Sequence, residues 1–239
     1  MEMNRKKTVF ITGASSGIGL AIARTLADNG YEVYGIGRNF DDDTKTISDS
    51  FHCVTCDITD DDSLKKCVDG IRKEHHIDVL INNAGCAYYG LHEELNASKI
   101  KEIVRTDLEA PLILTQMLLR DMKANGGSII NISSVTAISN ANPHGAAYGA
   151  AKAGLYSFSK SIFEEARKHG VRVTAILPDM TDTRLYRNAD FEAAGETGAS
   201  LSSQDVADAV LFVLSRPEGV VVEELVIRPQ LHRIKRKKK

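Results

Sequence analysis

The feature that most constrains this chain is an alternation of short apolar runs with longer helical patterns along its 239 residues. The apolar runs predict strands over residues 8–12, 32–36, 51–56, 79–82, 128–132, 171–177 and 220–227. The periodic segments between them predict helices over residues 17–29, 61–75, 97–125, 147–169 and 203–215. Strands separated by helices of this length form βαβ units, so we expect a doubly wound α/β fold with a seven-stranded parallel sheet and helices on both faces.

Length and composition narrow the class of protein. A chain of 239 residues is compatible with one α/β domain over 1–239, and an apolar share of 43% is enough for a normal core. The N-terminus lacks a signal-peptide core, and no stretch approaches the ~20 apolar residues that span a bilayer. We therefore expect a soluble, cytoplasmic protein with no membrane partner.

Positive and negative charges are nearly balanced along the chain, except in a basic run at the C-terminus. The net charge is −2, which predicts no nucleic-acid partner for the bulk of the protein. Residues 232–239 end in a basic run, which we interpret as a disordered, solubilising tail; binding of polyanions is the alternative. Residues 179–202 have little periodicity and two glycines, which predicts a substrate loop.

The four cysteines do not indicate a metal site. Cys53 and Cys56 have Cys-x-x-Cys spacing, but no second pair or histidine pair completes a zinc site. The pair also falls in a predicted strand, where residues three apart point to opposite faces. We expect structural thiols and no bound metal.

A glycine-rich turn follows the first predicted strand. Residues 12–19 read Thr-Gly-Ala-Ser-Ser-Gly-Ile-Gly, and a helix is predicted directly after them. Glycines let the backbone approach a pyrophosphate, and the helix N-terminus offers free N–H groups and a positive dipole end. In a Rossmann-type sheet, ligands bind at the carboxyl ends of the strands. The turn therefore predicts a dinucleotide site whose residues include Gly13, Ser15, Ser16, Gly17, Ile18 and Gly19.

The end of the second predicted strand bears on the choice of cofactor. Dinucleotide sites for NAD place an acid there to hold the ribose hydroxyls, whereas this strand ends without an acid and Arg38 follows. An arginine binds a 2′-phosphate with its planar fork. This favours NADP(H) over NAD(H), although the nearby Asp41, Asp42 and Asp43 keep NAD(H) open.

Tyr148 and Lys152 are four residues apart in a predicted helix, which places them on one face. An ammonium about 4 Å from a phenolate favours the phenolate by roughly 4 kcal/mol at an effective dielectric of ~20. That interaction lowers the tyrosine pKa by up to about three units, towards the range that proton transfer at neutral pH requires.

Taken together, these residues resemble the single-domain branch of the short-chain dehydrogenase/reductase family over nearly the whole chain. Residues 12–19 match its cofactor loop, residues 82–85 its Asn-Asn-Ala-Gly turn, and residues 178–183 a Pro-Gly-x-x-x-Thr turn at the nicotinamide. The resemblance implies a catalytic Ser134, Tyr148 and Lys152. It also implies cofactor contacts from Asp57, Ile58, Asn83, Ala84, Gly85, Tyr148, Lys152, Pro178, Thr181 and Thr183.

The resemblance implies an oxidoreductase that moves hydride between a nicotinamide and a ketone or secondary alcohol. Ser134 would hydrogen-bond the substrate oxygen, and Tyr148 would give or take its proton. Lys152 would lower the pKa of Tyr148 and hold the nicotinamide ribose. The cofactor supplies the redox chemistry.

Two residues depart from the family pattern. Asp179 replaces the glycine after Pro178, which predicts an altered turn. Asp107 stands at the position of a family asparagine whose main-chain carbonyl holds a water leading to the lysine. Pro111 cannot donate to that carbonyl, so we expect the carbonyl to stay free, whereas the carboxylate of Asp107 would pair with Lys152 and weaken its effect on Tyr148.

The substrate is not specified by the sequence. We expect a pocket lined by Cys86, Tyr88 and Tyr89, by residues 139–144, and by residues 180–199. The C-terminal Arg228-Pro229 ending is similar to that of NADP-dependent 3-hydroxy acid and small-alcohol dehydrogenases. Alternatives are a dinucleotide-binding sensor or scaffold with weak or no catalysis, and a nucleic-acid-associated protein acting through the basic tail.

The helices predicted over 97–125 and 147–169 also suggest an assembly. The first has more apolar surface than one sheet face needs, and the family resemblance points the same way. We expect a homodimer or homotetramer built on these helices. The apolar residues concerned are Leu112, Leu114, Met117 and Leu118.

Overall fold

The computed structural model describes residues 5–237. Met1–Asn4 and the last two lysines of the predicted basic tail lie outside the described residues. Seven parallel strands form the main sheet, in the order β3-β2-β1-β4-β5-β6-β8, which confirms the doubly wound α/β prediction. The strands are β1 (Thr8–Thr12), β2 (Glu32–Gly37), β3 (Phe51–Thr55), β4 (Ile77–Asn82), β5 (Gly127–Ile132), β6 (Val171–Pro178) and β8 (Glu224–Ile227).

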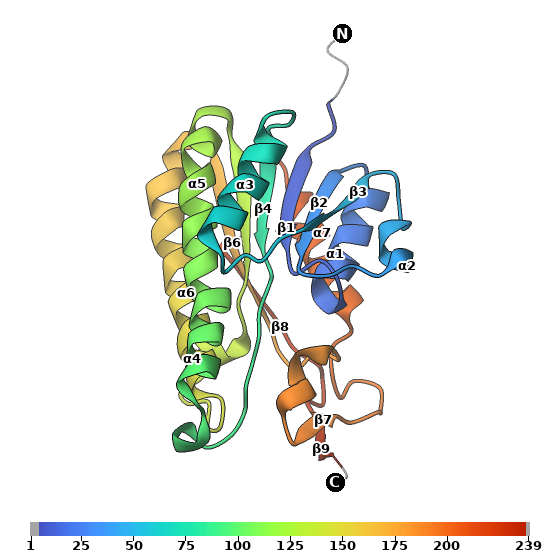
Figure 1. Ribbon diagram of the computed structural model, residues 1–239, viewed down its shortest axis with the longest axis vertical. Coiled ribbons are helices and arrows are strands. Elements are labelled where there is room, and N and C mark those ends of the chain that lie inside the picture. The colour runs from blue at the N-terminus through green and yellow to red at the C-terminus, as the bar shows by residue number, and fades with distance from the viewer. Residues whose placement is uncertain (1–4, 238–239) are drawn as a thin grey trace.

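The helices lie in two layers, one on each face of the sheet (Figure 1). Helices α1 (Gly17–Asp28) and α7 (Ser203–Leu214) pack together on one face, where Ile22, Leu26 and Val210 are fully buried. The other face is covered by α3 (Asp61–Arg72), α4 (Ala97–Val104), α5 (Ala110–Asn125) and α6 (Ala146–Ala166). A short helix α2 (Asp42–Lys45) lies between β2 and β3.

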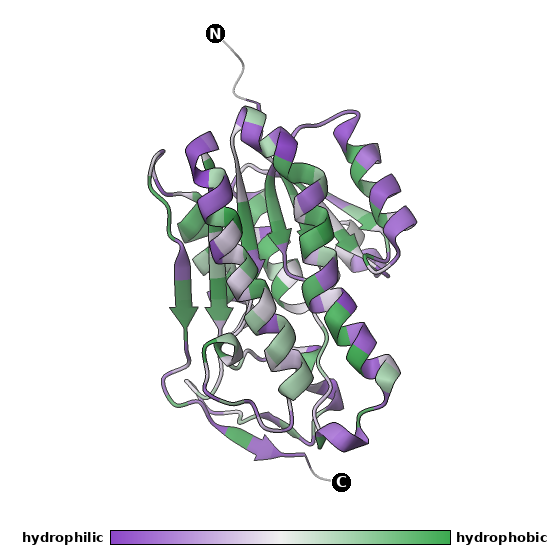
Figure 2. Ribbon diagram, turned by 90° about the vertical axis from the view of Figure 1, so that its left-hand side faces the viewer, coloured by the Kyte–Doolittle hydropathy of each residue, from purple (hydrophilic) through white to green (hydrophobic). Residues whose placement is uncertain are grey.

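The central strands are apolar on both faces because helices cover both. All five residues of β1 are buried, as expected for a strand inside a parallel sheet. Figure 2 shows the hydrophobic colour concentrated along the strands and the inner sides of the helices. The register pairs Ile11 of β1 with Ile81 of β4 and with Gly35 of β2, so the ends of these strands lie side by side.

The predicted helix 97–125 is one helical rod with an interruption. It consists of α4, a π-helical turn over Arg105–Glu109, and α5. Pro111 lies near the start of α5, just beyond this turn, and has no N–H to donate. The regular series of backbone hydrogen bonds is therefore interrupted at Pro111. Such π-turns are often found at functional sites.

Only some of the apolar residues of α5 that were predicted to form surplus apolar surface are exposed. Leu114 and Leu118 are 0% and 2% exposed and pack against the sheet, so they are not surplus apolar surface. Leu112 is 36% exposed, and Val104 of α4 is 40% exposed. The part of the chain that the structure describes contains no helix long and apolar enough to cross a membrane.

The C-terminal residues are more ordered than predicted. We expected residues 232–239 to form a disordered tail, but Ile234–Arg236 form strand β9, antiparallel to β7 (Phe191–Ala193). The substrate-loop segment also carries a 3₁₀ turn over Arg184–Asn188. Figure 1 shows β7 and β9 beside each other at the end of the molecule that carries the C-terminus.

Candidate active site

A cavity of about 280 Å³ lies at the carboxyl ends of the central strands. Every residue that the sequence predicts for catalysis or cofactor binding lines it, although the residues come from eight separate segments of the chain. Their individual roles stay predictions. They are Gly13, Ser15, Ser16, Gly17, Ile18, Gly19, Arg38, Asp57, Ile58, Asn83, Ala84, Gly85, Asp107, Ser134, Tyr148, Lys152, Pro178, Thr181 and Thr183.

The glycine-rich turn between β1 and α1 forms one wall. Gly13 has a φ of +70°, and a Cβ there would lie 2.8 Å from Ala84 Cα. At Gly19 a Cβ would lie 2.1 Å from the carbonyl oxygen of Gly13. Ser16 at the N-cap makes no side-chain bond to the helix, and the first turn of α1 contains no acid. The start of α1 is therefore suited to an anion, which fits the pyrophosphate of a dinucleotide.

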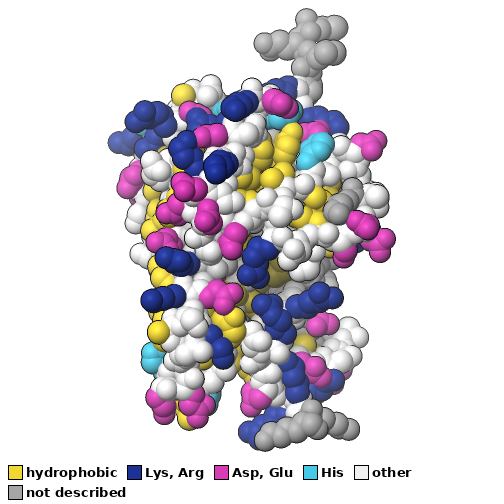
Figure 3. Space-filling model, viewed as in Figure 1, with side chains coloured by type: hydrophobic (Ala, Val, Ile, Leu, Met, Phe, Trp, Pro, Cys, Tyr) yellow, Lys and Arg dark blue, Asp and Glu magenta, His cyan; other side chains and the backbone are white. Residues whose placement is uncertain are grey.

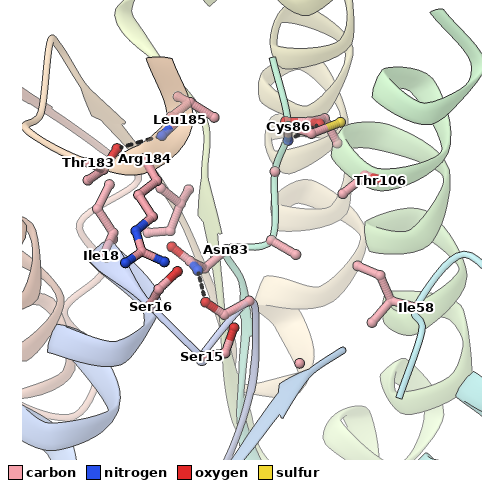
Figure 4. Close-up of a pocket in the computed structure, with 18 of the residues that line it drawn as sticks. Ser15, Ser16, Ile18, Ile58, Asn83, Cys86, Thr106, Thr183, Arg184 and Leu185 are labelled. Atoms are coloured by element: carbon pink, nitrogen blue, oxygen red, sulfur yellow. Dashed lines mark hydrogen bonds between the residues drawn. The ribbon is translucent and has the colours of Figure 1, made fainter. Parts of the chain in front are cut away.

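Asn83 holds this turn against the end of β4. Its Nδ2 donates to the carbonyl oxygen of Thr12 at 2.9 Å and to that of Gly13 at 3.3 Å. In return, Thr12 Oγ1 accepts from the N–H groups of Asn83 and Ala84, both at 3.0 Å. Figure 4 shows Asn83 between the glycine-rich turn and the segment that leads to Cys86. This exchange of hydrogen bonds fixes the cradle before any ligand binds.

Tyr148 and Lys152 lie one turn apart on α6 and are both buried. Lys152 Nζ donates to the carbonyl oxygen of Ile132 at 3.0 Å and lies 5.8 Å from the centre of the Tyr148 ring. Ser133 Oγ donates to the carbonyl oxygen of Lys152 at 2.9 Å, which attaches α6 to the end of β5. Ser134 follows directly, and its hydroxyl accepts from the Thr136 N–H at 3.2 Å.

Asp107 is fully buried behind this pair. Its Oδ2 accepts from the Cys86 N–H at 2.9 Å, and its Oδ1 lies 3.1 Å from Lys152 Nζ. The predicted contact between the Asp107 carboxylate and Lys152 is therefore present. Burial raises the pKa of Asp107, whereas the ammonium of Lys152 and the Cys86 N–H act in the opposite direction.

The electrostatics of Tyr148 differ from the prediction. We expected Lys152 to lower its pKa, but the pKa of Tyr148 lies well above the usual value, chiefly because the ring is buried. Tyr89, Asp107 and Tyr186 raise it further, and a side-chain hydrogen bond with Ser134 lowers it. Burial therefore outweighs the expected effect of Lys152, whose ammonium is paired with Asp107.

Arg38 stands at the rim of the cavity, as predicted, with its side chain 66% exposed. Its Nη1 lies 4.0 Å from Oε1 of Glu102 on α4. Glu102 Oε2 accepts a hydrogen bond from the Tyr88 hydroxyl at 2.6 Å. Of the nearby acids, Asp41 caps α2 by accepting from the Thr44 N–H at 2.8 Å.

Tyr89 is part of an aromatic cluster next to Tyr148. Its ring centre lies 6.3 Å from that of Tyr148, 5.9 Å from Tyr186 and 5.2 Å from Phe191. The cavity lining includes Cys86 and Arg184–Arg187, but not Tyr88, Tyr89 or residues 139–144. The expected pocket is thus found on the side of the substrate loop and not on that of residues 139–144.

The lining also contains polar side chains that were not predicted from the sequence, among them Glu102 on α4 and Thr106 in the π-turn. Nothing in the local sequence distinguishes these two from ordinary exposed positions, since only the packing of α4 brings them to the cavity. Arg184 belongs to the predicted substrate loop, and Figure 4 shows its side chain directed toward Ser16. Figure 3 shows Lys and Arg side chains gathered between α4 and the segment that carries β7 and β9.

Asp179 does not disturb the turn after β6. The non-glycine residues with positive φ among those described are His144 and His232, so the position of Asp179 needs no glycine. Its carboxylate is buried and accepts from the Met180 N–H at 2.8 Å. Arg228 Nη1 lies 3.1 Å from its Oδ2, and His232 Nδ1 lies 3.0 Å from its Oδ1.

Comparison with known proteins identifies the family. A family model described as short chain dehydrogenase matches residues 7–193. An uncharacterized oxidoreductase of Staphylococcus epidermidis is 33% identical over 237 residues, which are 96% of this chain and 100% of the relative. The 3-oxoacyl-acyl-carrier-protein reductase FabG of Escherichia coli is 33% identical over 230 residues, or 91% and 93% of the two chains.

The fold is also that of solved enzymes. The alcohol dehydrogenase from the archaeon Thermococcus sibiricus, complexed with 5-hydroxy-NADP, aligns with a TM-score of 0.85 and 25% identity. The alignment covers 96% of this chain and 99% of that one. The likeness therefore extends over the sheet, both helical layers and the cavity.

Proposed function

The chain belongs to the short-chain dehydrogenase/reductase family of NAD(P)-dependent oxidoreductases, and we propose that it interconverts a ketone and a secondary alcohol with NADP(H). One observation carries the proposal. A single cavity contains both the phosphate cradle at the start of α1 and the side chains of Ser134, Tyr148 and Lys152. A dinucleotide bound there brings its nicotinamide to the acid–base group.

The residues present fit the dinucleotide. The open N-terminus of α1 would hold the pyrophosphate, and Asp57 and Ile58, which line the same cavity, would contact the adenine. Pro178, Thr181 and Thr183 also line the cavity and would contact the nicotinamide. The bound cofactor supplies or accepts the hydride.

The acid–base chemistry is assigned to this chain's own residues. Ser134 hydrogen-bonds the substrate oxygen and orients it towards Tyr148. In reduction, the Tyr148 hydroxyl donates its proton to the carbonyl oxygen; in oxidation, the phenolate takes the proton from the alcohol. The raised pKa of Tyr148 keeps its hydroxyl protonated, which is the form that donates the proton in reduction.

NADP(H) is proposed over NAD(H) because of Arg38. It follows β2 at the position where an acid holds the NAD ribose, and it lines the cavity. The alternative acid, Asp41, has its carboxylate engaged in capping α2. The similar alcohol dehydrogenase from Thermococcus sibiricus is complexed with 5-hydroxy-NADP, which also favours NADP(H) for this chain.

The substrate is proposed to be a small uncharged or weakly charged carbonyl compound. Tyr186 lines the cavity, and the rings of Tyr89 and Phe191 pack against it beside Tyr148, which suits an apolar or ring-shaped group. The Arg228-Pro229 ending supports a small alcohol or 3-hydroxy acid, whereas the relative FabG points to 3-oxoacyl groups.

A screen for carbonyl-dependent oxidation of NADPH tests the proposal. The panel contains ketones, hydroxy acids, steroids and acyl thioesters, and Tyr148→Phe serves as the inactive control. Turnover by the wild type that Tyr148→Phe loses supports the proposal. Tight NADPH binding without turnover of any class would replace it with the sensor or scaffold function.

That second candidate is favoured by one observation, the buried pair of Asp107 and Lys152. The pair engages the lysine that a working Tyr148 needs, so a chain that binds dinucleotide without rapid catalysis is consistent with it. Turnover of Asp107→Asn distinguishes the two candidates, since an active variant shows that the remaining machinery is competent.

A homodimer or homotetramer is also proposed. The exposed Leu112 and Val104 lie on the helical layer formed by α4, α5 and α6. Sedimentation at micromolar concentration tests the assembly, and a pure monomer would refute it. Leu112→Glu, placed on this face, is expected to shift the distribution towards monomer.

A further inference from the structure

The C-terminal residues after β8 run along the substrate loop over their whole described length. We propose that residues 228–237 form a strap that holds the loop closed over the cavity, with Asp179 as the positioning residue at its base. The proposal rests on the proposed function only in assigning substrate to the aromatic wall that the loop supplies.

The base of the strap is a buried carboxylate in contact with two side chains of the C-terminal segment. The Asp179 side chain is 6% exposed, and its two oxygens face Arg228 at 3.1 Å and His232 at 3.0 Å. A carboxylate removed from water at this level is stabilised by such partners. Asp179 lies directly after β6, so these contacts attach the strap to the main sheet.

His232 shows that the path of the strap is imposed by its surroundings. Its backbone has a φ of 46°, in the left-handed region that residues with a side chain rarely adopt. Such a conformation costs about 1–3 kcal/mol and persists where neighbouring contacts determine it. The contact with Asp179 and the hydrogen bonds of the adjacent Leu231 and Arg233 are those neighbours.

The middle of the strap is joined to the loop by backbone hydrogen bonds. The N–H of Leu231 donates to the carbonyl oxygen of Gly198 at 2.9 Å, and that of Arg233 donates to Ala199 at 3.0 Å. Strand β9 then pairs with β7, with Ala193 opposite Ile234. A two-stranded sheet of three residues each has little stability of its own, so each segment depends on the other.

The far end of the strap reaches the aromatic wall. Lys237 Nζ donates to the carbonyl oxygens of Tyr186 at 2.7 Å and Arg187 at 3.2 Å, within the 3₁₀ turn of the loop. The Tyr186 ring lies 5.9 Å from Tyr89, which lies 6.3 Å from Tyr148. The strap therefore determines where the wall of the substrate pocket stands relative to the catalytic phenol.

Truncation after Leu231 tests the strap in the otherwise complete chain. The readout is hydrogen exchange of the Ala189 and Ala199 amides, because their acceptors, Tyr186 and Glu196, belong to the loop and not to the strap. We expect exchange at both to accelerate by at least about tenfold, while the Ser133 amide, bonded to Ile176 between β5 and β6, is unchanged. Unchanged exchange at Ala189 and Ala199 would overturn the proposal.

Single substitutions keep the test decisive if the truncated chain fails to fold. Lys237→Met removes the ammonium from the loop carbonyls, and Arg236→Met is the matched control because alternate residues of a strand point to opposite faces. We expect faster exchange at Ala189 and a raised KM for the carbonyl substrate with a smaller change in kcat, only in Lys237→Met. Equal behaviour of the two variants would contradict the strap.

The two proposals fail in different ways. If the wild type turns over no carbonyl compound but truncation still loosens the loop, the strap stands and the proposed reaction is wrong. If turnover is normal and truncation changes neither exchange nor KM, the reaction stands and the strap is wrong. Asp179→Asn, which retains an acceptor for the Met180 N–H but loses the charge, is expected to loosen the loop as truncation does.

Discussion

Lys152 Nζ lies 3.1 Å from the buried carboxylate oxygen Oδ1 of Asp107, and this ion pair is the main departure of the site from the arrangement expected of the family. The pair has two consequences for the proposed acid–base group. It directs the lysine charge away from the phenol, and it places a negative charge near Tyr148 that raises the pKa of the phenol. Both consequences oppose formation of the phenolate.

Asp107→Asn is therefore expected to keep or increase activity. The sign follows from the charges: a carboxylate disfavours the nearby phenolate, so a neutral amide lowers the pKa of Tyr148 and lets Lys152 act on it. The rise of the alcohol-oxidation rate with pH should move to lower pH. Measurement of kcat against pH for wild type and variant checks this, with Asp121→Asn on the exposed side of α5 as control.

An inactive Asp107→Asn enzyme would mean that the carboxylate itself takes part in the chemistry. A profile displaced to higher pH would contradict the electrostatic argument. Either result would also show that the family pattern misleads at this position.

Pro111→Ala is expected to reduce kcat more than Asp107→Asn does. Pro111 has no N–H, so it cannot donate to the Asp107 carbonyl, and the π-turn over Arg105–Glu109 lies next to it. Alanine restores the donor and lets the helix take up the carbonyl that we assign to a water leading to Lys152. Comparison of kcat at fixed pH checks the order of the two variants. A Pro111→Ala enzyme with wild-type kcat would remove the carbonyl from the mechanism.

The residues predicted for the site lie together in the structure where a local sequence pattern defines them. The glycine-rich turn, the Asn-Asn-Ala-Gly turn and the Tyr148–Lys152 spacing are each defined by neighbouring residues, and all of them line one cavity. The central strands were recognised for a similar reason, since a strand buried on both faces is a continuous apolar run.

The features missed are those that depend on contacts between distant segments. The contacts of Asp179 with Arg228 and His232 join the end of β6 to the C-terminal segment, and a short run of basic residues contains no sign of them. The pKa of Tyr148 was mispredicted for the same reason. The spacing of Tyr148 and Lys152 fixes their positions on α6, but not the burial of the phenol or the ion pair formed by Lys152 with Asp107.

Tyr148→Phe is expected to lower kcat by at least about a hundredfold, because only the phenolic proton is lost and general acid–base catalysis contributes that much or more. NADPH binding, measured by fluorescence, should be unchanged. Tyr156→Phe is the matched control: Tyr156 lies on the same helix, where its hydroxyl meets Glu224 away from the cavity. Retention of more than about a tenth of wild-type kcat by Tyr148→Phe would contradict the assignment.

Gly19→Ala is expected to abolish dinucleotide binding and to lower the melting temperature. The added Cβ would lie 2.1 Å from the Gly13 carbonyl oxygen and 2.5 Å from Asn83 Nδ2, so the cradle must shift. Gly70→Ala is the control, because a Cβ there meets nothing within 4 Å and helix α3 gains roughly 1 kcal/mol from the better helix former. Calorimetry and NADPH titration of both variants check the contrast. Binding by Gly19→Ala at wild-type affinity would contradict the cradle.

Preference for NADPH is expected to depend on Arg38 and to be moderated by Glu102. Arg38→Ala should lower kcat/KM for NADPH by roughly ten- to a hundredfold, the value of charge-assisted hydrogen bonds to a phosphate, and leave NADH almost unaffected. Glu102 lies 4.0 Å from Arg38 in an exposed pair, so Glu102→Gln should improve kcat/KM for NADPH by only a few-fold. The ratio of kcat/KM for the two cofactors, measured for wild type and both variants, checks this. A wild type that prefers NADH, or an Arg38→Ala ratio equal to that of the wild type, would show that another residue binds the adenosine ribose.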